Sequence, residues 1–247
     1  MIGWMLRGFA ERIVAELRVL STMGLAGVLR AFGPEFEAAH GVRLEAEFLP
    51  TMRLLERIRA GERGDVAILT EEGVDELLAE GVLEGRADLA RSFVGLAVRA
   101  GAAHPDISTR DAFVAALLRA RSVAMSKAGA SGIFMAGLLE RLGIAQAVRE
   151  KATILASGFT AELAAAGQVE IAIQQVSELM VVPGVEIVGR LPAELGGETV
   201  FAAGLFHGAA EPELGRALIA ALAAPDRADL YRSCGLEPAG TGAPIRA

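Results

Sequence analysis

Apolar and polar residues follow two periods along the chain, and the two periods alternate. Every second residue is apolar over 42–48 (VRLEAEF), which predicts a strand with one buried face. The run GDVAILT at 64–70 is almost wholly apolar, as is typical of a strand buried on both faces. Over 25–36, apolar residues instead recur every three or four positions, which predicts an amphipathic helix.

The same reading along the whole chain gives an alternation of strands and helices. The expected strands are LRVLS (17–21), VRLEAEF (42–48), GDVAILT (64–70), FVGLAVRAG (93–101), SVAM (122–125), ATILASG (152–158), EIAIQQ (170–175), PGVEIVG (183–189) and TVFAAGLF (199–206). The expected helices are 25–39, 52–60, 74–81, one that follows Ser108–Thr109, 130–143, 160–167, 211–223 and 225–233. This rhythm predicts an α/β fold with mostly parallel sheets. No flexible linker divides the chain, so two lobes would have to be joined within structured segments, at 92–99 and 189–201.

Residues 1–16 form a separate apolar and charged segment. Met5, Phe9 and Ile13 are spaced four apart, which predicts an extra N-terminal helix. Such a helix could lie on the body of the protein or join two copies in a homodimer. Charged residues interrupt the segment, so it lacks the unbroken apolar stretch of a secretory signal. We therefore expect a cytoplasmic protein, or a periplasmic one if a leader sequence is missing.

Composition narrows the functional classes. Hydrophobic residues make up 53% of the 247-residue chain, which predicts a large core and argues against disorder. No apolar run approaches the roughly 18 residues of a membrane helix, so membrane insertion is not expected. The net charge of −7 argues against a nucleic-acid partner. One Cys and three His make a disulfide framework or a zinc site improbable, and no cofactor-binding motif occurs, so we expect neither metal nor cofactor.

Hydroxyl, amide and glycine residues recur where expected strands lead into helices. Five such junctions are STMG (21–24), PTMR (50–53), SKAGASG (126–132), SGFT (157–160) and QQVSE (174–178). Taken singly, these residues are ordinary caps and turn residues. Together they place hydrogen-bond donors and helix N-termini at the edge where open α/β sheets bind ligands, which predicts a site for a small anion.

Several segments in order resemble the type II periplasmic solute-binding fold, in particular the molybdate-binding component of ABC transporters. These are LRVLSTMGLAGVLRAF, HGVRLEAEF, RLLERIRAGERGDVAIL, ASGIFMAGLLERLGI and AGQVEIAIQQVSEL with PGVEIVGRLP, which together cover about Leu17 to Pro238. The resemblance implies two lobes, each a mostly parallel sheet flanked by helices, that close on a ligand. It divides the chain into lobe 1 (17–92 plus 194–247) and lobe 2 (93–193).

The resemblance also implies which residues hold the ligand. The first hydroxyl of molybdate binders falls on Gly24, or is displaced to Ser21 and Thr22, and the second falls on Thr51. The third position falls on Ser131, next to Gly132, and the position of a Tyr hydroxyl falls on Gln175. The fourth loop aligns poorly, with Phe159 among its candidates. Two cations beside these loops, Arg53 and Lys127, complete the candidate set.

The departures from the molybdate pattern change the expected ligand. Gly24 removes one hydroxyl, and Arg53 is suited to bind a planar carboxylate through two hydrogen bonds. We therefore expect a small organic carboxylate rather than molybdate as the ligand of a binding protein. Two alternatives stay open. One is a cofactor-independent isomerase of a small carboxylic acid similar to aconitate isomerases, with Ser131, Glu178 or Lys127 as the acid–base group. The other is a sensor that responds to ligand-driven closure.

Overall fold

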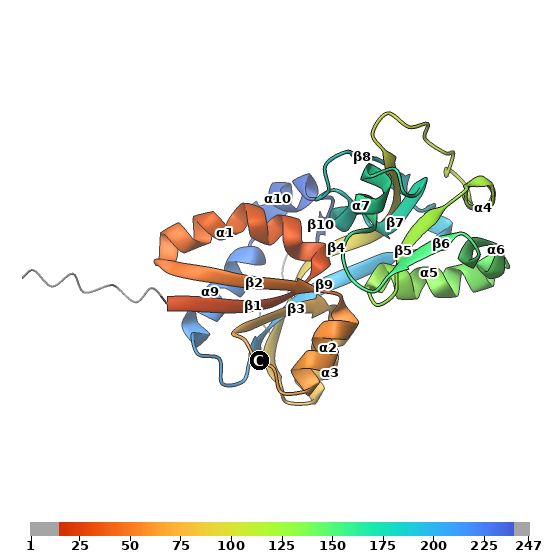
Figure 1. The fold of residues 1–247 in the computed structure, drawn as a ribbon. Helices are drawn as coiled ribbons and strands as arrows, with labels where there is room; N and C mark the ends of the chain where they lie inside the picture. The colour runs from red at the N-terminus through yellow and green to blue at the C-terminus, as the bar shows by residue number, and fades with distance from the viewer. Residues whose placement is uncertain (1–14, 240–247) are drawn as a thin grey trace, which may run out of the picture.

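The computed structural model describes residues 15–239, whose strands form two halves of a sheet joined by one long strand (Figure 1). The strands are β1 (Ala15–Thr22), β2 (Val42–Leu49), β3 (Val66–Thr70), β4 (Leu83–Arg99), β5 (Val123–Ser126), β6 (Ala152–Leu155), β7 (Ile171–Gln175), β8 (Val185–Arg190), β9 (Glu198–Phe206) and β10 (Glu237–Pro238). The helices are α1 (Ala26–His40), α2 (Thr51–Arg59), α3 (Glu71–Ala79), α4 (Arg110–Arg119), α5 (Ala130–Arg141), α6 (Ala145–Arg149), α7 (Thr160–Ala165), α8 (Val176–Leu179), α9 (Pro212–Leu222) and α10 (Ala228–Ser233). Three short 3-10 turns are η1 (Met23–Leu25), η2 (Ala193–Leu195) and η3 (Pro225–Arg227).

The strand order confirms an α/β architecture of two lobes. The first lobe has the order β2-β1-β3-β9-β4, and the second continues as β4-β7-β5-β6. The strands β1, β2 and β3 pair in parallel, as do β5, β6 and β7. The strands that connect the lobes are antiparallel to their neighbours. Parallel strands end at the same edge, so the loops after β1, β2 and β3, and those after β5 and β7, gather at two edges.

The two lobes are connected through β4 and the chain that returns before β9. Phe93 is the last residue of β4 that pairs with β9, and Val94 is the first that pairs with β7. The returning chain is held at the same place, because Val94 exchanges backbone hydrogen bonds with Leu191 and Gly197. Both connections lie within the two segments that the sequence predicts. The exact boundaries of the lobes stay a prediction.

Helices cover both faces of each half, and each face has its own buried cluster. In the first lobe, α1, α9 and α10 pack on one face and α2 and α3 on the other. In the second, α4, α5 and α6 cover one face and α7 and α8 the other. The helices on both faces explain why central strands such as β3 and β7 are buried along their whole length, and why β3 is a nearly continuous apolar run. Each sheet is therefore a rigid base for the loops at its edge.

Several segments differ from the sequence-based expectation: the short helices α6 and α8 are not expected from the pattern, and the strands β4 and β1 begin before their expected starts. Strand β4 begins at Leu83, ten residues before the expected start at Phe93. Its first half is rich in charged residues and contains a glycine with φ of 62° at Gly85, which hides the strand pattern. Strand β1 begins at Ala15, inside the segment assigned to the N-terminal helix, and the rest of that helix lies outside the described residues.

Within residues 15–239, no helix is both long enough and apolar enough to cross a membrane. The same residues hold no group of three or more His, Cys, Asp and Glu side chains arranged to bind a metal ion.

Candidate functional site

The first lobe presents buried hydroxyls at the ends of its parallel strands. Ser21 and Thr22 end β1, and the Ser21 hydroxyl donates to the Thr22 carbonyl at 3.0 Å. Gly24 lies against the Phe201 ring, where a Cβ atom would be only 2.5 Å from the ring edge. The missing hydroxyl at Gly24 therefore has a steric reason, since any side chain would displace Phe201. Gly24 therefore packs closely against Phe201 and offers only backbone atoms to a ligand, not a hydroxyl.

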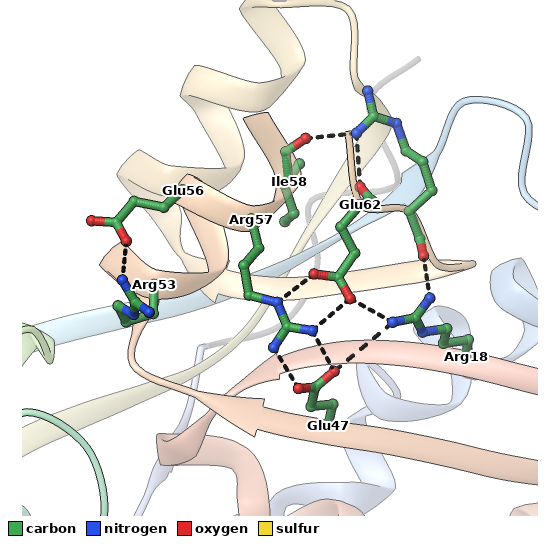
Figure 2. Close-up of polar contacts among 8 residues, drawn as sticks. Arg18, Glu47, Arg53, Glu56, Arg57, Ile58 and Glu62 are labelled. Atoms are coloured by element: carbon green, nitrogen blue, oxygen red, sulfur yellow. Dashed lines mark hydrogen bonds and ion pairs between the residues drawn. The ribbon is translucent and has the colours of Figure 1, made fainter. Parts of the chain in front are cut away.

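Helix α2 carries Thr51 as its first residue, directly after Pro50. The Thr51 side chain is buried, and its Oγ1 has no hydrogen-bond partner among the described residues. The last turn of the helix is fixed by an ion-pair network (Figure 2), in which the Arg57 Nη2 lies 2.7 Å from Glu62 and 3.1 Å from Glu47. Arg18 on β1 joins Glu47 and Glu62, so the network ties α2 to both β1 and β2. The Arg57 guanidinium holds the pKa of Glu62 below its usual range.

Arg53 lies on the same helix but outside this network. Its side chain is 60% exposed and pairs with Glu56 on the same helix, at 2.6 Å (Figure 2). Exposed pairs of this kind contribute little stability, so the guanidinium can exchange Glu56 for another carboxylate at small cost. Arg53 therefore lies only two positions after Thr51 in the chain, but its side chain is on the surface and not among the buried hydroxyls.

In the second lobe, the turn from β5 into α5 folds tightly on itself. The Ser126 and Ser131 hydroxyls are buried and lie 3.4 Å apart. At Gly132 a Cβ atom would lie 2.1 Å from the Ser126 carbonyl oxygen, so only glycine permits this approach. The first turn of α5 therefore directs its N–H groups toward the strand end, which favours a negative charge there. The Lys127 side chain is exposed, and its backbone N–H bonds to Leu155.

The end of β7 contacts the strands that join the lobes. Gln175 is 1% exposed, and its Nε2 donates to the Thr199 hydroxyl on β9 at 3.1 Å. Ser177 follows it, and the hydroxyls of Ser177 and Ser92 on β4 lie 3.4 Å apart. The Gln175 Oε1 is buried and has no partner within residues 15–239. Gln175 thus combines a fixed contact to a connecting strand with a free polar atom.

The loop before α7 is tied to β7 by a neighbouring glutamine. The Gln174 Oε1 accepts hydrogen bonds from the backbone N–H of Thr160 at 2.8 Å and from its hydroxyl at 3.0 Å. The Gln174 Nε2 donates to the Gly158 carbonyl at 3.2 Å. Phe159 lies between them, half-buried at the start of α7. The fourth and fifth junctions of the sequence analysis are therefore one connected unit.

Glu178 is a buried carboxylic acid beside this unit. Its side chain is 5% exposed, and its Oε2 has no partner among the described residues. Burial raises the pKa of Glu178 to about 7, while hydrogen bonds from the Gln174 side chain and the Gln175 backbone act in the opposite direction. The short helix α8 that carries it lies against η1, the turn that contains Gly24. A carboxyl group with a pKa near neutrality can both accept and release a proton.

The candidate residues lie in several separate groups, and their side chains do not all contact one another. Ser21, Thr22, Gly24 and Thr51 lie at the edge of the first lobe, Ser131 and Gly132 at the edge of the second, and Gln175 between them. Arg53 and Lys127 are exposed, and Phe159 is half-buried. Their assignment as ligand-binding residues stays a prediction. Three of the buried atoms that have no hydrogen-bond partner among the described residues belong to these groups: Thr51 Oγ1, Gln175 Oε1 and Glu178 Oε2. The Thr51 hydroxyl can donate to an oxygen atom of a ligand, whereas the Gln175 Oε1 can only accept a hydrogen bond.

Sequence reasoning missed two residues that hold this site, Ser92 and Thr199. Both lie in strands and make their contacts over more than 20 residues of chain. No local motif marks them, because their importance depends on the register of β4 against β7 and β9.

Comparison with known proteins identifies the family. The family model described as bacterial extracellular solute-binding protein matches residues 17–237. The chain belongs to this family. An aconitate isomerase from Pseudomonas sp. is 35% identical over 237 residues, which span 93% of this chain and 90% of the relative.

Solved structures agree with this solute-binding family at the level of the fold. The periplasmic molybdate-binding protein of Azotobacter vinelandii superimposes with a TM-score of 0.74 at 17% identity, covering 89% of this chain and 98% of that one. A periplasmic thiamin binding protein gives a TM-score of 0.73 at 12% identity, covering 94% and 86%. These neighbours confirm the type II periplasmic-binding-protein fold expected from the sequence.

Proposed function

We propose that the protein binds aconitate, or a closely similar unsaturated polycarboxylate, between its two lobes and isomerises it. The observation that carries the proposal is the 35% identity to an aconitate isomerase over nearly the full length of both chains. Membership of a solute-binding family supports the binding step. Rearranging the double bond of such an acid without a cofactor requires one proton to leave a carbon atom and one proton to be added elsewhere on the same molecule.

The site contains groups suited to both halves of this task. Thr51, Ser131 and the first turn of α5 offer neutral donors to the ligand's carboxylates. Arg53 and Lys127 lie on the surface near these positions and bring positive charge as the lobes close. Glu178 takes up a proton from the substrate and returns one, and its pKa near 7 suits this role.

The proposal is tested by following cis- and trans-aconitate with the protein in D₂O by proton NMR. We expect one isomer to convert into the other, with deuterium incorporated at carbon. Binding without turnover would contradict the isomerase proposal. It would support the second candidate, a carboxylate-binding protein without chemistry, which the solute-binding family favours. A cytoplasmic location and a homodimer formed through the N-terminal helix also stay proposals.

Removing the Arg53 guanidinium should weaken trans-aconitate binding. A hydrogen bond to a charged group contributes about 1.5–3 kcal/mol, so we expect Arg53→Ala to raise the Kd by about ten- to a hundredfold. Isothermal titration calorimetry measures the change. Arg149→Ala is the matched control, because Arg149 on α6 is similarly exposed and pairs with Glu140 on α5 in the second lobe. An unchanged Kd for Arg53→Ala would remove Arg53 from the site.

The Thr199 hydroxyl should act on the ligand through Gln175. Thr199→Val keeps the side-chain shape but removes the partner of the Gln175 amide, which then loses its fixed orientation. A neutral hydrogen bond contributes about 0.5–1.5 kcal/mol, so the Kd for trans-aconitate should rise about two- to tenfold. Thr199→Ser should restore wild-type affinity. If valine binds as tightly as threonine at an unchanged melting temperature, Thr199 does not position Gln175.

A further inference from the structure

An arginine-lined pocket lies beside the connection between the lobes, and none of the candidate ligand-binding residues named above lines it. It has a volume of about 420 Å³ and is lined by Arg91, Arg190, Arg232 and residues 235–238. Arg91 comes from β4, Arg190 from the end of β8, and Arg232 from α10, so three separate elements contribute a guanidinium group. Figure 1 shows β4, β8, β10 and α10 meeting in this region.

The charge of this pocket contrasts with that of the chain. The formal net charge is −7, yet the residues that line the pocket include three arginines and, among the described residues, one carboxylate, Glu237. Arg190 Nη1 donates to Glu237 at 2.6 Å, whereas Arg91 lies 3.7 Å from it. All three arginines hold the pKa of Glu237 below its usual range, Arg190 most strongly. Glu237 is thus one acid shared among three cations.

The remaining partners of these arginines are exposed carboxylates, Glu198 beside Arg91 and Asp229 at 2.8 Å from Arg232. Arg91 is 3.8 Å from Glu198, beyond hydrogen-bond distance. Its Nε is buried and has no hydrogen-bond partner in the part of the chain that the structure describes. Arg232 pairs with Asp229 one helical turn away, and the Asp229 side chain is fully in solvent. Exposed pairs of this kind are readily exchanged for a stronger anion.

We propose that this pocket is a binding site for a phosphate group. Three guanidinium groups that come from separate elements and line one pocket match a compact dianion with several oxygen atoms better than a single planar carboxylate, which one arginine satisfies. A bound phosphate accepts hydrogen bonds from Arg91 and Arg232 and competes with Glu237 for Arg190. Arg190 stays oriented meanwhile, because its guanidinium stacks on the Phe93 ring at 3.9 Å.

The pocket is also connected to the first site. Gly235 lines it, and a Cβ at Gly235 would lie 2.5 Å from the Met180 sulfur and 3.4 Å from the Ser177 backbone nitrogen. The wall of the pocket therefore packs directly on α8 and the residue that follows it, close to Gln175 and Glu178. This contact places the phosphate site at the joint between the lobes without making it part of the carboxylate site.

The test is calorimetric titration of the full chain with inorganic phosphate at low ionic strength and pH 7.5. We expect saturable binding to one site, weakened at least tenfold by Arg91→Gln and by Arg232→Gln. Glu237→Gln removes the competing carboxylate and should tighten binding several-fold, an effect in the opposite direction that misfolding cannot imitate. Arg149 lies in the second lobe and does not line the pocket, so Arg149→Gln should leave the Kd unchanged.

Two further arms separate the alternatives. Glycerol phosphate that binds as tightly as inorganic phosphate would identify a phosphate ester as the ligand, and weaker binding would identify the free ion. Thr51→Val should leave phosphate binding intact; if it abolishes binding, phosphate occupies the carboxylate site instead and the proposal is wrong. It is equally overturned if the wild-type protein shows no saturable binding, or if none of the three pocket variants changes the Kd.

Discussion

Glu178→Gln should abolish turnover of aconitate while leaving its binding intact. Glutamine keeps the size and hydrogen-bonding capacity of the side chain but cannot take up a proton. General acid–base catalysis typically contributes a factor of about 10²–10⁴, so we expect kcat to fall about a thousandfold. The Kd of trans-aconitate should change by less than about threefold, because the neutral donors and Arg53, not Glu178, are assigned to the carboxylates.

The pH profile gives a second readout of the same role. Burial raises the pKa of Glu178 to about 7. If its carboxylate form removes the proton, kcat should rise with pH and level off above about pH 8. The control is Glu213→Gln on α9, where the carboxylate is exposed and pairs only with Arg216 among the described residues. If Glu178→Gln has the kcat of the wild type, Glu178 is not the proton-transfer group. If the wild-type protein itself does not turn over aconitate, the isomerase proposal is wrong.

Several elements of the fold can be predicted from local sequence patterns alone. The apolar runs of β1, β3 and β9 and the amphipathic pattern of α1 are local signals, and the structure has these elements where the pattern predicts them. The junctions at 50–53 and 126–132 are local as well, since a strand end, a hydroxyl and a helix start follow one another within a few residues. The first half of β4 is not predicted from the sequence, because it is rich in charged residues and contains Gly85 at a positive φ.

The polar contacts of the site depend on distant residues. Gln175 could be selected from the sequence, but its partner Thr199 is 24 residues away and is defined only by strand register. Glu178 could be named as a candidate acid, but its raised pKa follows from its burial on α8, which packs against η1 and β4. For Arg53, the local sequence suggests a larger role than the structure shows. This cation follows a predicted binding loop, but its side chain points to the surface and pairs with Glu56. Local pattern thus predicts which loops gather, and packing decides which side chains within them are buried.

The buried Glu178 should also make the folded protein less stable as the pH rises. Its pKa is about 7 in the folded protein against 4.5 in an unfolded chain, so between these values the folded state retains a proton that the unfolded state has lost. Stability therefore falls with increasing pH over this range and is lowest above pH 7. The difference between a pKa of 4.5 and one of about 7 corresponds to about 3 kcal/mol. Glutamine stays neutral throughout, so Glu178→Gln should avoid this loss.

Urea unfolding of the wild type and Glu178→Gln at pH 5, 6.5 and 8 measures the effect. The free energy of unfolding of the variant, relative to wild type, should increase by about 2–3 kcal/mol from pH 5 to pH 8, because a small part of the effect is already present at pH 5. Glu213→Gln should show no such trend, since its carboxylate is exposed. A constant difference at all three pH values would mean that Glu178 is already ionised at pH 5 in the folded protein. A difference in the free energy of unfolding that rises with pH, together with lost turnover in Glu178→Gln, would assign both effects to one buried carboxyl group. The burial that raises the pKa of Glu178 to about 7 would then both suit it to proton transfer and lower the stability of the protein in the same pH range.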